Sequence, residues 1–417
     1  ESWQLIEIDR EIDPARLSII SRRLRSTLDD VGAAVADWRS MRGRLRELAV
    51  ALEKSPPPMP DKEVEEARAL VEWMVDKIFS LFGYRRYSLE RGRGQDFLKP
   101  DVASGLGILS ARRAGNARPR PTRLTGEIRR RAREREMLVI TKANAVATVH
   151  RATYLDYVSL KTFDRRGAVS GEHRFLGLWT SSAYSHSPSE IPVLRRKVSQ
   201  VFAHFGLPPQ SHDAKAVLHV LETFPRDELF QASVAELITV VRGIVNLYER
   251  QELRLFVRRD PFRRFYSCFV FVPRDRYNTE VRERIEAIVL HAFHGKAIET
   301  QVQLSDSVLA RAHILVRTDP DDPHKADLAE IEKLMARAVR TWSDAFREAL
   351  AARYDEARCL ALIRRFERAF SDVQGNTGVG AQSVPVGVVV PEFHPFGDLR
   401  GLRLQFLQAD DIRGVAL

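Results

Sequence analysis

Apolar residues recur at every seventh position between residues 17 and 52, a spacing typical of a long helix with one apolar stripe. The stripe consists of Leu17, Leu24, Val31, Trp38, Leu45 and Leu52, flanked by Ile20, Leu28, Val35, Met41 and Leu48. Asp13-Pro14 predicts the start of the helix, because an aspartate can cap it and a proline fits its first turn. The pattern predicts one long helix, or two helices with a kink near Gly43, that end before Pro56-Pro57-Pro58. The stripe suits a dimerising coiled coil or a helix packed on its own domain, and packing is favoured because no complementary charges flank the stripe.

The residues on either side of this helix predict strands and a second helix. Residues 3–9 alternate between apolar and polar, which indicates a half-buried strand, and residues 61–82 have the period of an amphipathic helix. Short strands are then predicted at 83–89, 106–109, 137–141, 154–163 and 175–182. Together these strands predict an antiparallel β domain over residues 81–185.

Helical signals return between residues 187 and 250. Ser187-Pro188-Ser189-Glu190 is a capping box with proline at the first helical position, and Gly206 is expected to end that helix. A second capping box, Ser233-Val234-Ala235-Glu236, predicts a helix to about Tyr248, and a shorter helix is expected at 212–223. We expect these helices to link two β-containing units.

The next stretch has the order β-β-α-β-β-α. Strands are predicted at 253–257, 265–272, 298–304 and 308–316, a helix capped by Asn278 lies between the second and third, and a charged helix follows at 325–354. Long apolar strands with helices on one face are typical of an α+β sandwich, so α+β is the predicted fold class. From residue 371 onward the chain is rich in Gly, Val and Pro, and one further strand is expected at 402–407.

These patterns predict five segments in 417 residues. They are an N-terminal part with the long helix (1–60), a helix with the antiparallel β module (61–185), a helical linker (186–250), the α+β module (251–355), and a helix end with the Gly/Val/Pro-rich tail (356–417). The composition, with 44% hydrophobic and 29% charged residues, is that of a globular chain and excludes general disorder.

The net charge of +10 comes almost entirely from one segment. Residues 91–135 carry 13 Lys and Arg against four acids, a surplus of nine. Glycines and prolines interrupt the segment, and Phe97 is its only aromatic residue, whereas single-strand binders interleave stacking rings with the charges. We therefore expect a solvated, mobile insertion here, with a loop that binds RNA or another polyanion as the less favoured alternative.

Other features point to a reducing cytoplasmic setting. Cys268 and Cys359 are too few and too far apart for a disulfide scaffold. No apolar run is long enough to span a bilayer, and residues 1–3 do not begin a secretory leader, so no membrane partner is expected. Because the sequence does not start with Met, we expect it to be a piece of something longer.

Motifs for catalysis are missing from the sequence. Gly375–Gly380 has the wrong spacing for a dinucleotide loop, and His212 and His219 have no third metal ligand nearby. Cys268 sits within an apolar strand and is expected to be a small core residue. No catalytic residue, cofactor site or metal site is therefore assigned to the chain.

Two groups of polar residues at strand ends form the candidate effector or interface site. They are Arg258, Arg259 and Asp260, and Arg274, Arg276, Tyr277 and Asn278. Guanidinium groups beside a helix N-terminus suit a carboxylate, so a pocket for a small anion or amino acid is one interpretation. The favoured alternative is a charge network that pins loops or joins two domains.

Several strings in the chain resemble the large bacterial NAD-specific glutamate dehydrogenases. They include residues 140–144 (ITKAN), His150-Arg151, 174–178 (RFLGL), 191–197 (IPVLRRK), 222–230 (ETFPRDELF), 258–262 (RRDPF), 271–280 (FVPRDRYNTE) and 304–313 (LSDSVLARAH). They occur in colinear order over about residues 1–370. After about residue 370 the sequence departs from the family pattern.

The resemblance implies ACT-type modules and a PAS-like β module joined by helices. Residues 1–10 would be the end of a first ACT-type module, 81–185 the PAS-like module and 250–355 the second ACT-type module. It also implies a cytoplasmic homo-oligomer that uses NAD to deaminate glutamate to 2-oxoglutarate through a Rossmann domain further toward the C-terminus. None of the matched strings belongs to the nucleotide or substrate site. We therefore expect a non-catalytic regulatory and assembly region that partners its own catalytic domain and binds an amino-acid effector. The alternatives are a scaffold without an effector and, least favoured, an RNA-binding module.

Overall fold

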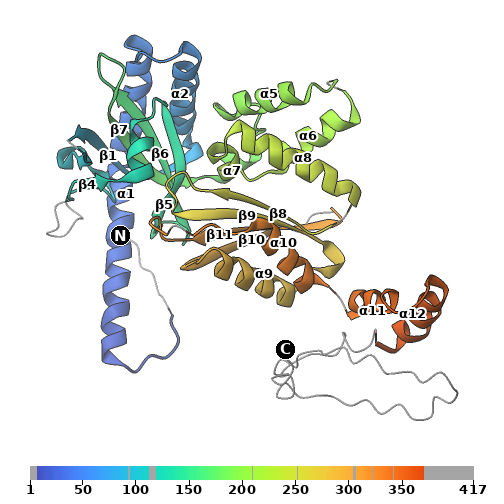
Figure 1. Cartoon of the computed structure of the whole chain (residues 1–417). Helices are drawn as coiled ribbons and strands as arrows, with labels where there is room; N and C mark the ends of the chain where they lie inside the picture. Colours follow the sequence, from blue (N-terminus) through green and yellow to red (C-terminus); the bar gives the residue numbers. More distant parts are fainter. Residues whose placement is uncertain are drawn as a thin grey trace. The chain divides into compact units, whose positions relative to one another are not determined.

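The structure, a computed structural model, describes residues 7–370 except 93, 112–118, 209, 251, 304–306, 323 and 341. The chain divides into two compact units, residues 1–334 and residues 335–417. Blocks of helix and antiparallel sheet follow one another along the chain (Figure 1), which confirms the predicted α+β class. The predicted strand at 402–407 and residues 3–6 of the predicted first strand lie outside the described residues, and residues 7–9 form no strand.

The long N-terminal helix α1 runs unbroken from Pro14 to Lys54. Asp13 caps it by accepting a hydrogen bond from the amide of Ala15 at 2.9 Å, as the sequence predicts. Gly43 lies inside the continuous helix, so the kink considered there does not occur.

Only the C-terminal half of α1 packs on its own domain. Met41 and Leu45 are fully buried in the core that α1 shares with α2 (Asp61–Trp73) and strand β1 (Phe79–Arg91). Leu24, Leu28 and Val35 are 39%, 52% and 71% exposed, although they belong to the same stripe. The prediction that the stripe packs on its own domain is therefore wrong for residues 17–35. This part of the helix extends beyond the core that buries Met41 and Leu45, so its apolar stripe is exposed.

A seven-stranded antiparallel sheet follows, in the order β4-β2-β1-β7-β6-β5, with β3 paired to β1. Its strands are β1 (Phe79–Arg91), β2 (Asp96–Pro100), β3 (Leu106–Gly107), β4 (Thr122–Leu124), β5 (Leu138–Val146), β6 (Tyr154–Phe163) and β7 (Val169–Trp179). The strands predicted at 83–89, 137–141 and 154–163 are confirmed. The last strand ends at Trp179, and residues 181–185 form the short helix α4 (Ser181–Ser185) in place of a strand end.

The arginine-rich segment contributes strands and a helix to this sheet, so the prediction of a mobile insertion is wrong for its described residues, although basic residues such as Arg120, Arg123 and Arg130 are exposed to solvent as expected. β2 pairs with both β1 and β4, and α3 (Gly126–Arg133) follows. The fully buried Asp96 accepts hydrogen bonds from Arg133 Nε at 2.6 Å and Nη2 at 2.8 Å. The acid that anchors α3 lies 37 residues earlier in the chain, so the composition of the segment could not show that it is folded.

Helices α5 (Leu194–Phe205), α6 (His212–Thr223), α7 (Arg226–Gln231) and α8 (Val234–Arg250) form the helical region. The capping box at Ser233 is confirmed, since its amide donates to Glu236 at 2.7 Å. The box at Ser187 does not start α5. That helix starts seven residues later, because Glu66 of α2 accepts hydrogen bonds from the Val193 amide at 2.6 Å and from Arg195 at 2.8 Å.

The second sheet is antiparallel, in the order β10-β11-β9-β8. It consists of β8 (Arg254–Arg259), β9 (Phe265–Pro273), β10 (Ala297–Gln303) and β11 (Leu309–Arg317), with α9 (Thr279–Ala292) between β9 and β10. Asn278 caps α9 as predicted, accepting a hydrogen bond from the Val281 amide at 2.9 Å. Alternate residues of β9 face opposite sides: Phe269 packs on Phe224 of the helical region, and Tyr266 stacks on Phe293 after α9.

The charged helix predicted at 325–354 is interrupted. The chain forms α10 (Leu328–Val339), α11 (Trp342–Ala351) and α12 (Glu356–Phe370) instead. The division between the two units falls within α10, between residues 334 and 335. The expected α+β segment of 251–355 therefore spans that division.

Aromatic packing joins the first sheet to the helical region. Trp179 at the end of β7 stacks on Phe230 of α7, with ring centroids 4.9 Å apart and 9° between the ring planes. Phe79 of β1 meets the same indole edge-on at 4.8 Å. The two sheets and the helices between them thus share one core, which fixes the position of the cavity described next.

Candidate functional site

A polar cavity of about 380 Å³ lies where the first sheet, helix α7 and the second sheet meet. Its volume is in the range of small-molecule sites. The lining comes from strand β5 and the β5–β6 loop (Lys142, Arg151, Thr153), from α4 and α7 (Tyr184, Pro225, Asp227, Glu228, Gln231) and from β10 and β11 (Glu299, Gln301, His313, Leu315).

Lys142 lines the cavity, and two carboxylates share its ammonium group. Its Nζ lies 2.6 Å from Asp156 Oδ1, on the directly paired strand β6, and 2.9 Å from Asp227 Oδ2 on α7. Burial alone would lower the pKa of Lys142, but the two carboxylates outweigh it and hold the pKa above its usual value. Burial, together with the charge of Asp227, raises the pKa of Asp156 to about 6.

A second buried ion pair adjoins the first. Arg258 on β8 donates from Nε and Nη2 to the two carboxylate oxygens of Glu228, both at 2.8 Å. Burial acts to raise the pKa of Glu228, but Arg258 holds that pKa below its ordinary value. His313 of β11 lies 3.8 Å from the same carboxylate, and burial lowers the pKa of its imidazole.

The residues predicted around position 258 belong to this junction. Asp260 accepts hydrogen bonds from Arg264 Nε at 2.8 Å and from Thr141 Oγ1 of β5 at 3.1 Å. Arg259 has its guanidinium over the Tyr266 ring, 5.0 Å from the ring centre. Arg258 and Asp260 therefore join the second sheet to α7 and to the first sheet.

The residues predicted around position 276 lie at the opposite end of the hairpin. Strand β9 runs from Phe265 to Pro273, and Arg274 and Arg276 lie in the 3₁₀ turn that follows it. Nine residues of extended strand span roughly 30 Å. The structure thus separates the two arginine groups, and none of the seven predicted residues lines the cavity itself.

Most cavity residues were missed by motif reasoning. Lys142, Glu228 and His313 come from segments up to 171 positions apart, so no local spacing marks them. A usable signal was present nonetheless, because a lysine within an apolar strand needs a buried partner. All three residues also lie in the strings that carry the family resemblance.

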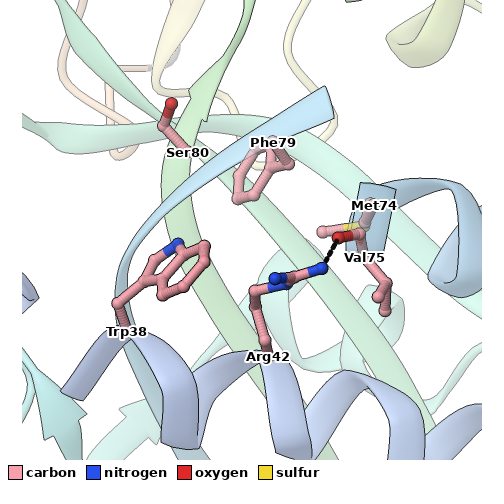
Figure 2. Close-up of a pocket in the computed structure, with 6 residues that line it drawn as sticks. All are labelled: Trp38, Arg42, Met74, Val75, Phe79 and Ser80. Atoms are coloured by element: carbon pink, nitrogen blue, oxygen red, sulfur yellow. Dashed lines mark hydrogen bonds between the residues drawn. The ribbon is translucent and has the colours of Figure 1, made fainter. Parts of the chain in front are cut away.

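A smaller cavity of about 210 Å³ lies where α1 meets β1 (Figure 2). Figure 2 shows Trp38 and Arg42 from α1 facing Phe79 of β1. Arg42 Nη2 donates to the carbonyl of Val75 at 2.9 Å, within the π-helical turn Met74–Ile78. Since π turns leave carbonyls without their usual helical donors, Arg42 has a structural role here.

Two protein families match within the chain. The glutamate dehydrogenase helical motif 1 matches residues 191–250, and the glutamate dehydrogenase ACT2 domain matches residues 254–343. The NAD-specific glutamate dehydrogenases of Halomonas elongata and Pseudomonas aeruginosa are each 34% identical over 89% of the chain, and that of Mycobacterium tuberculosis is 28% identical over all of it. The chain is homologous to a region of the large NAD-specific glutamate dehydrogenases.

The chain spans about a quarter of the length of those relatives, 23% to 25%. The ACT2 match contains the whole second sheet, and the helical motif 1 match contains α5 to α8. The cavity therefore has one wall from each matched family and one from the seven-stranded sheet. Among the described residues no helix has the length and apolarity to cross a bilayer, and no three His, Cys, Asp or Glu side chains form a metal cluster.

Proposed function

We propose that this chain is a regulatory and assembly region of an NAD-dependent glutamate dehydrogenase. The complete enzyme would oxidise glutamate to 2-oxoglutarate in the cytoplasm, and NAD would bind to a separate catalytic domain of the same protein. The chain itself would not carry out the reaction. In this proposal the seven-stranded sheet is the PAS-like module of the region.

One observation carries the regulatory half of the proposal: the polar cavity is walled by three modules that buried ion pairs lock together. Lys142 joins the first sheet to α7, and Glu228 joins α7 to the second sheet. Arg317 of β11 also reaches back to the carbonyl of Ala143 at 3.2 Å. A ligand in such a cavity would touch all three modules at once, so a change in the positions of the modules would change its contacts, as allosteric coupling requires.

The purified chain, supplied with glutamate and NAD, tests the non-catalytic assignment. We expect no NADH by absorbance, while a preparation of a complete relative under the same conditions serves as the positive control. Glutamate-dependent NADH formation that scales with the concentration of the chain would contradict the proposal.

The assembly half of the proposal rests on the exposed N-terminal half of α1. Its exposed apolar residues, Leu17, Leu24, Leu28 and Val35, recur at intervals of four and seven positions, as in a coiled-coil seam. Two copies of the helix would bury this seam against each other. The aspartates near its end do not form a complementary acidic block, because Asp30 is buried on Thr148 and Asp37 accepts a hydrogen bond from the Gly107 amide.

We therefore propose a second copy of this chain as the partner of residues 14–35. Roughly three heptads form only a marginal coiled coil, so the pair should dissociate in the micromolar range. Sedimentation equilibrium should show a concentration-dependent dimer that the exposed-face double substitution Leu24→Asp, Leu28→Asp abolishes. The substitution Ser26→Asp, exposed on the opposite face of the helix, is the control for added charge. A chain that stays monomeric at every concentration would overturn this assignment.

A further inference from the structure

The smaller cavity, between α1 and β1, has an apolar lining with a single charged side chain. Three of its lining residues are half-buried and three are buried: Trp38, Arg42 and Ser80, and Met74, Val75 and Phe79. The polar groups of these side chains are the guanidinium of Arg42, the hydroxyl of Ser80 and the indole N–H of Trp38. An apolar pocket with a few polar groups is typical of a small-molecule site.

Arg42 carries a positive charge that no carboxylate in the described part of the chain neutralises. The bond from its Nη2 to the Val75 carbonyl is its one hydrogen bond to a described residue. Its Nε is buried and has no acceptor among these residues. By contrast, the buried Arg226 donates to three backbone carbonyls. Because buried polar groups are normally paired, the free donors of Arg42 beside a cavity indicate a missing acceptor.

The guanidinium of Arg42 is already held in place. Its Cζ lies 4.8 Å from the centre of the Trp38 ring, and Figure 2 shows it between that ring and the carbonyl of Val75, with the Phe79 ring across from it. A side chain fixed in this way loses little conformational entropy when it binds an anion. A planar carboxylate, which accepts hydrogen bonds from a guanidinium, suits this position.

The size and the lining of the cavity limit the rest of the ligand. Its volume of about 210 Å³ equals that of roughly seven water molecules in the liquid, so it has room for an acid of about eight non-hydrogen atoms. The body of such an acid would lie against Met74, Val75 and Phe79, which are buried and apolar. None of the described lining residues is acidic, so an ammonium group on the ligand would be desolvated without a partner.

We propose that this cavity binds a small apolar monocarboxylate, with its carboxylate on Arg42 and its hydrocarbon body against Met74, Val75 and Phe79. The site shares no lining residue with the larger polar cavity and does not depend on the proposed function. It would place a ligand directly between α1 and the first sheet.

Isothermal titration of the purified full chain tests the proposal with 4-methylpentanoate and benzoate. Each should bind with a Kd of about 1 mM or lower. The amides of the two acids lack the charge and acetate lacks the apolar body, so all three should bind at least about 10-fold more weakly. L-Leucine, which adds an ammonium to 4-methylpentanoate, should not compete with it.

Two cavity variants and one matched control assign the binding to this cavity. Arg42→Gln should weaken the binding of 4-methylpentanoate by roughly 10- to 100-fold, as expected for losing a hydrogen bond to a charged group. Trp38→Leu keeps the arginine but removes one wall, and should weaken binding several-fold. Arg39→Gln, exposed on the same helix and outside the cavity lining, should leave the Kd unchanged.

Melting curves without ligand check that the three variants are folded, and Trp38→Leu decides the test if Arg42→Gln does not fold. The site is overturned if neither acid binds at concentrations up to about 10 mM, or if the folded cavity variants bind as tightly as the unmodified chain. Equal affinity for benzoate and benzamide would overturn the role of the Arg42 charge. Competition by L-leucine would overturn the restriction to acids without an ammonium group.

Discussion

Glu228 on α7 and Arg258 on β8 form a bidentate ion pair with two 2.8 Å hydrogen bonds, and both side chains are buried. The pair fixes the second sheet to the helical region. It lies beside His313 and the cavity, so its geometry sets one wall of the candidate site. The two residues are 30 positions apart, and the contact exists only because the helices fold back onto the sheet.

Glu228→Gln should lower the free energy of unfolding by about 3–5 kcal/mol, because it leaves the buried Arg258 without a counter-charge. Urea unfolding of both proteins measures the difference. Glu72→Gln is the matched control: it removes the partner of Arg68 in an exposed i,i+4 pair and should cost less than about 0.5 kcal/mol. Equal costs for the two substitutions would mean that the Arg258 side chain is hydrated in solution.

Asp96→Asn should loosen the arginine-rich segment without unfolding the chain. The buried Asp96 carboxylate holds Arg133 in two hydrogen bonds and lies 3.4 Å from Arg129. Arg133 lowers the pKa of Asp96, so this acid is ionised at neutral pH. Without that charge, limited trypsin digestion should cut residues 119–135 several times faster.

Glu127→Gln is the control for Asp96→Asn, because Glu127 pairs with Arg130 on the surface of α3. It should change the digestion pattern little. Unchanged cleavage in Asp96→Asn would show that the β2–β4 pairing alone holds the segment.

His173 should make the chain less stable in acid. Its Nδ1 and the Tyr84 hydroxyl share a hydrogen bond of 2.8 Å. Burial, with Arg86 and Arg44 nearby, lowers the pKa of His173 to about 4, whereas an unfolded histidine titrates near 6.5. Between these values the unfolded state binds more protons, so stability is complete above about pH 6.5 and is lost as the pH falls toward 4.

His173→Gln should remove part of this acid sensitivity, at most about 3 kcal/mol between pH 7 and pH 4. Urea midpoints measured across that range give the slope for each protein. The charge of the neighbouring Glu172 raises the pKa of His173, so it opposes the effect. A variant of the exposed His212 controls for general effects of substitution, and identical pH slopes for His173→Gln and the unmodified chain would contradict the prediction.

Local signals in the sequence predicted the elements whose ends are fixed by nearby residues. Asp13, Ser233 and Asn278 each cap a helix with a group within three positions, and the structure confirms all three. The predicted start of α5 was wrong because the amide of Val193 donates its hydrogen bond to Glu66, 127 positions earlier in the chain. A cap supplied by a different helix leaves no local spacing in the sequence.

The same distinction explains the candidate site. The sequence indicated Arg258 and Asp260 as charged residues at a strand end, but the partners that define their role, Glu228 and Thr141, come from other modules. The arginine-rich segment was misjudged for a related reason. Its surplus charge is visible in the composition, while the burial of Asp96 that orders it is a consequence of strand pairing.

Lys142→Met should destabilise the chain in a pH-dependent way. The substitution leaves Asp156 and Asp227 near one another in a buried site, without the ammonium they share. Burial already raises the pKa of Asp156 to about 6 with Lys142 in place, and removing the cation should raise it further. An acid whose pKa is higher in the folded state binds more protons there, so stability falls as the pH rises through that window.

The loss caused by Lys142→Met should therefore be about 3–5 kcal/mol at pH 8 and clearly smaller at pH 5, where the carboxylates can take up a proton. Lys161→Met is the matched control. It removes another buried ammonium, but one bound to the carbonyls of Arg131 and Glu134 and to a partly exposed Glu136. Its cost should change little between the two pH values, since no pair of buried carboxylates is left behind. If Lys142→Met loses as much stability at pH 5 as at pH 8, the two carboxylates are not coupled through the lysine, and the prediction is wrong.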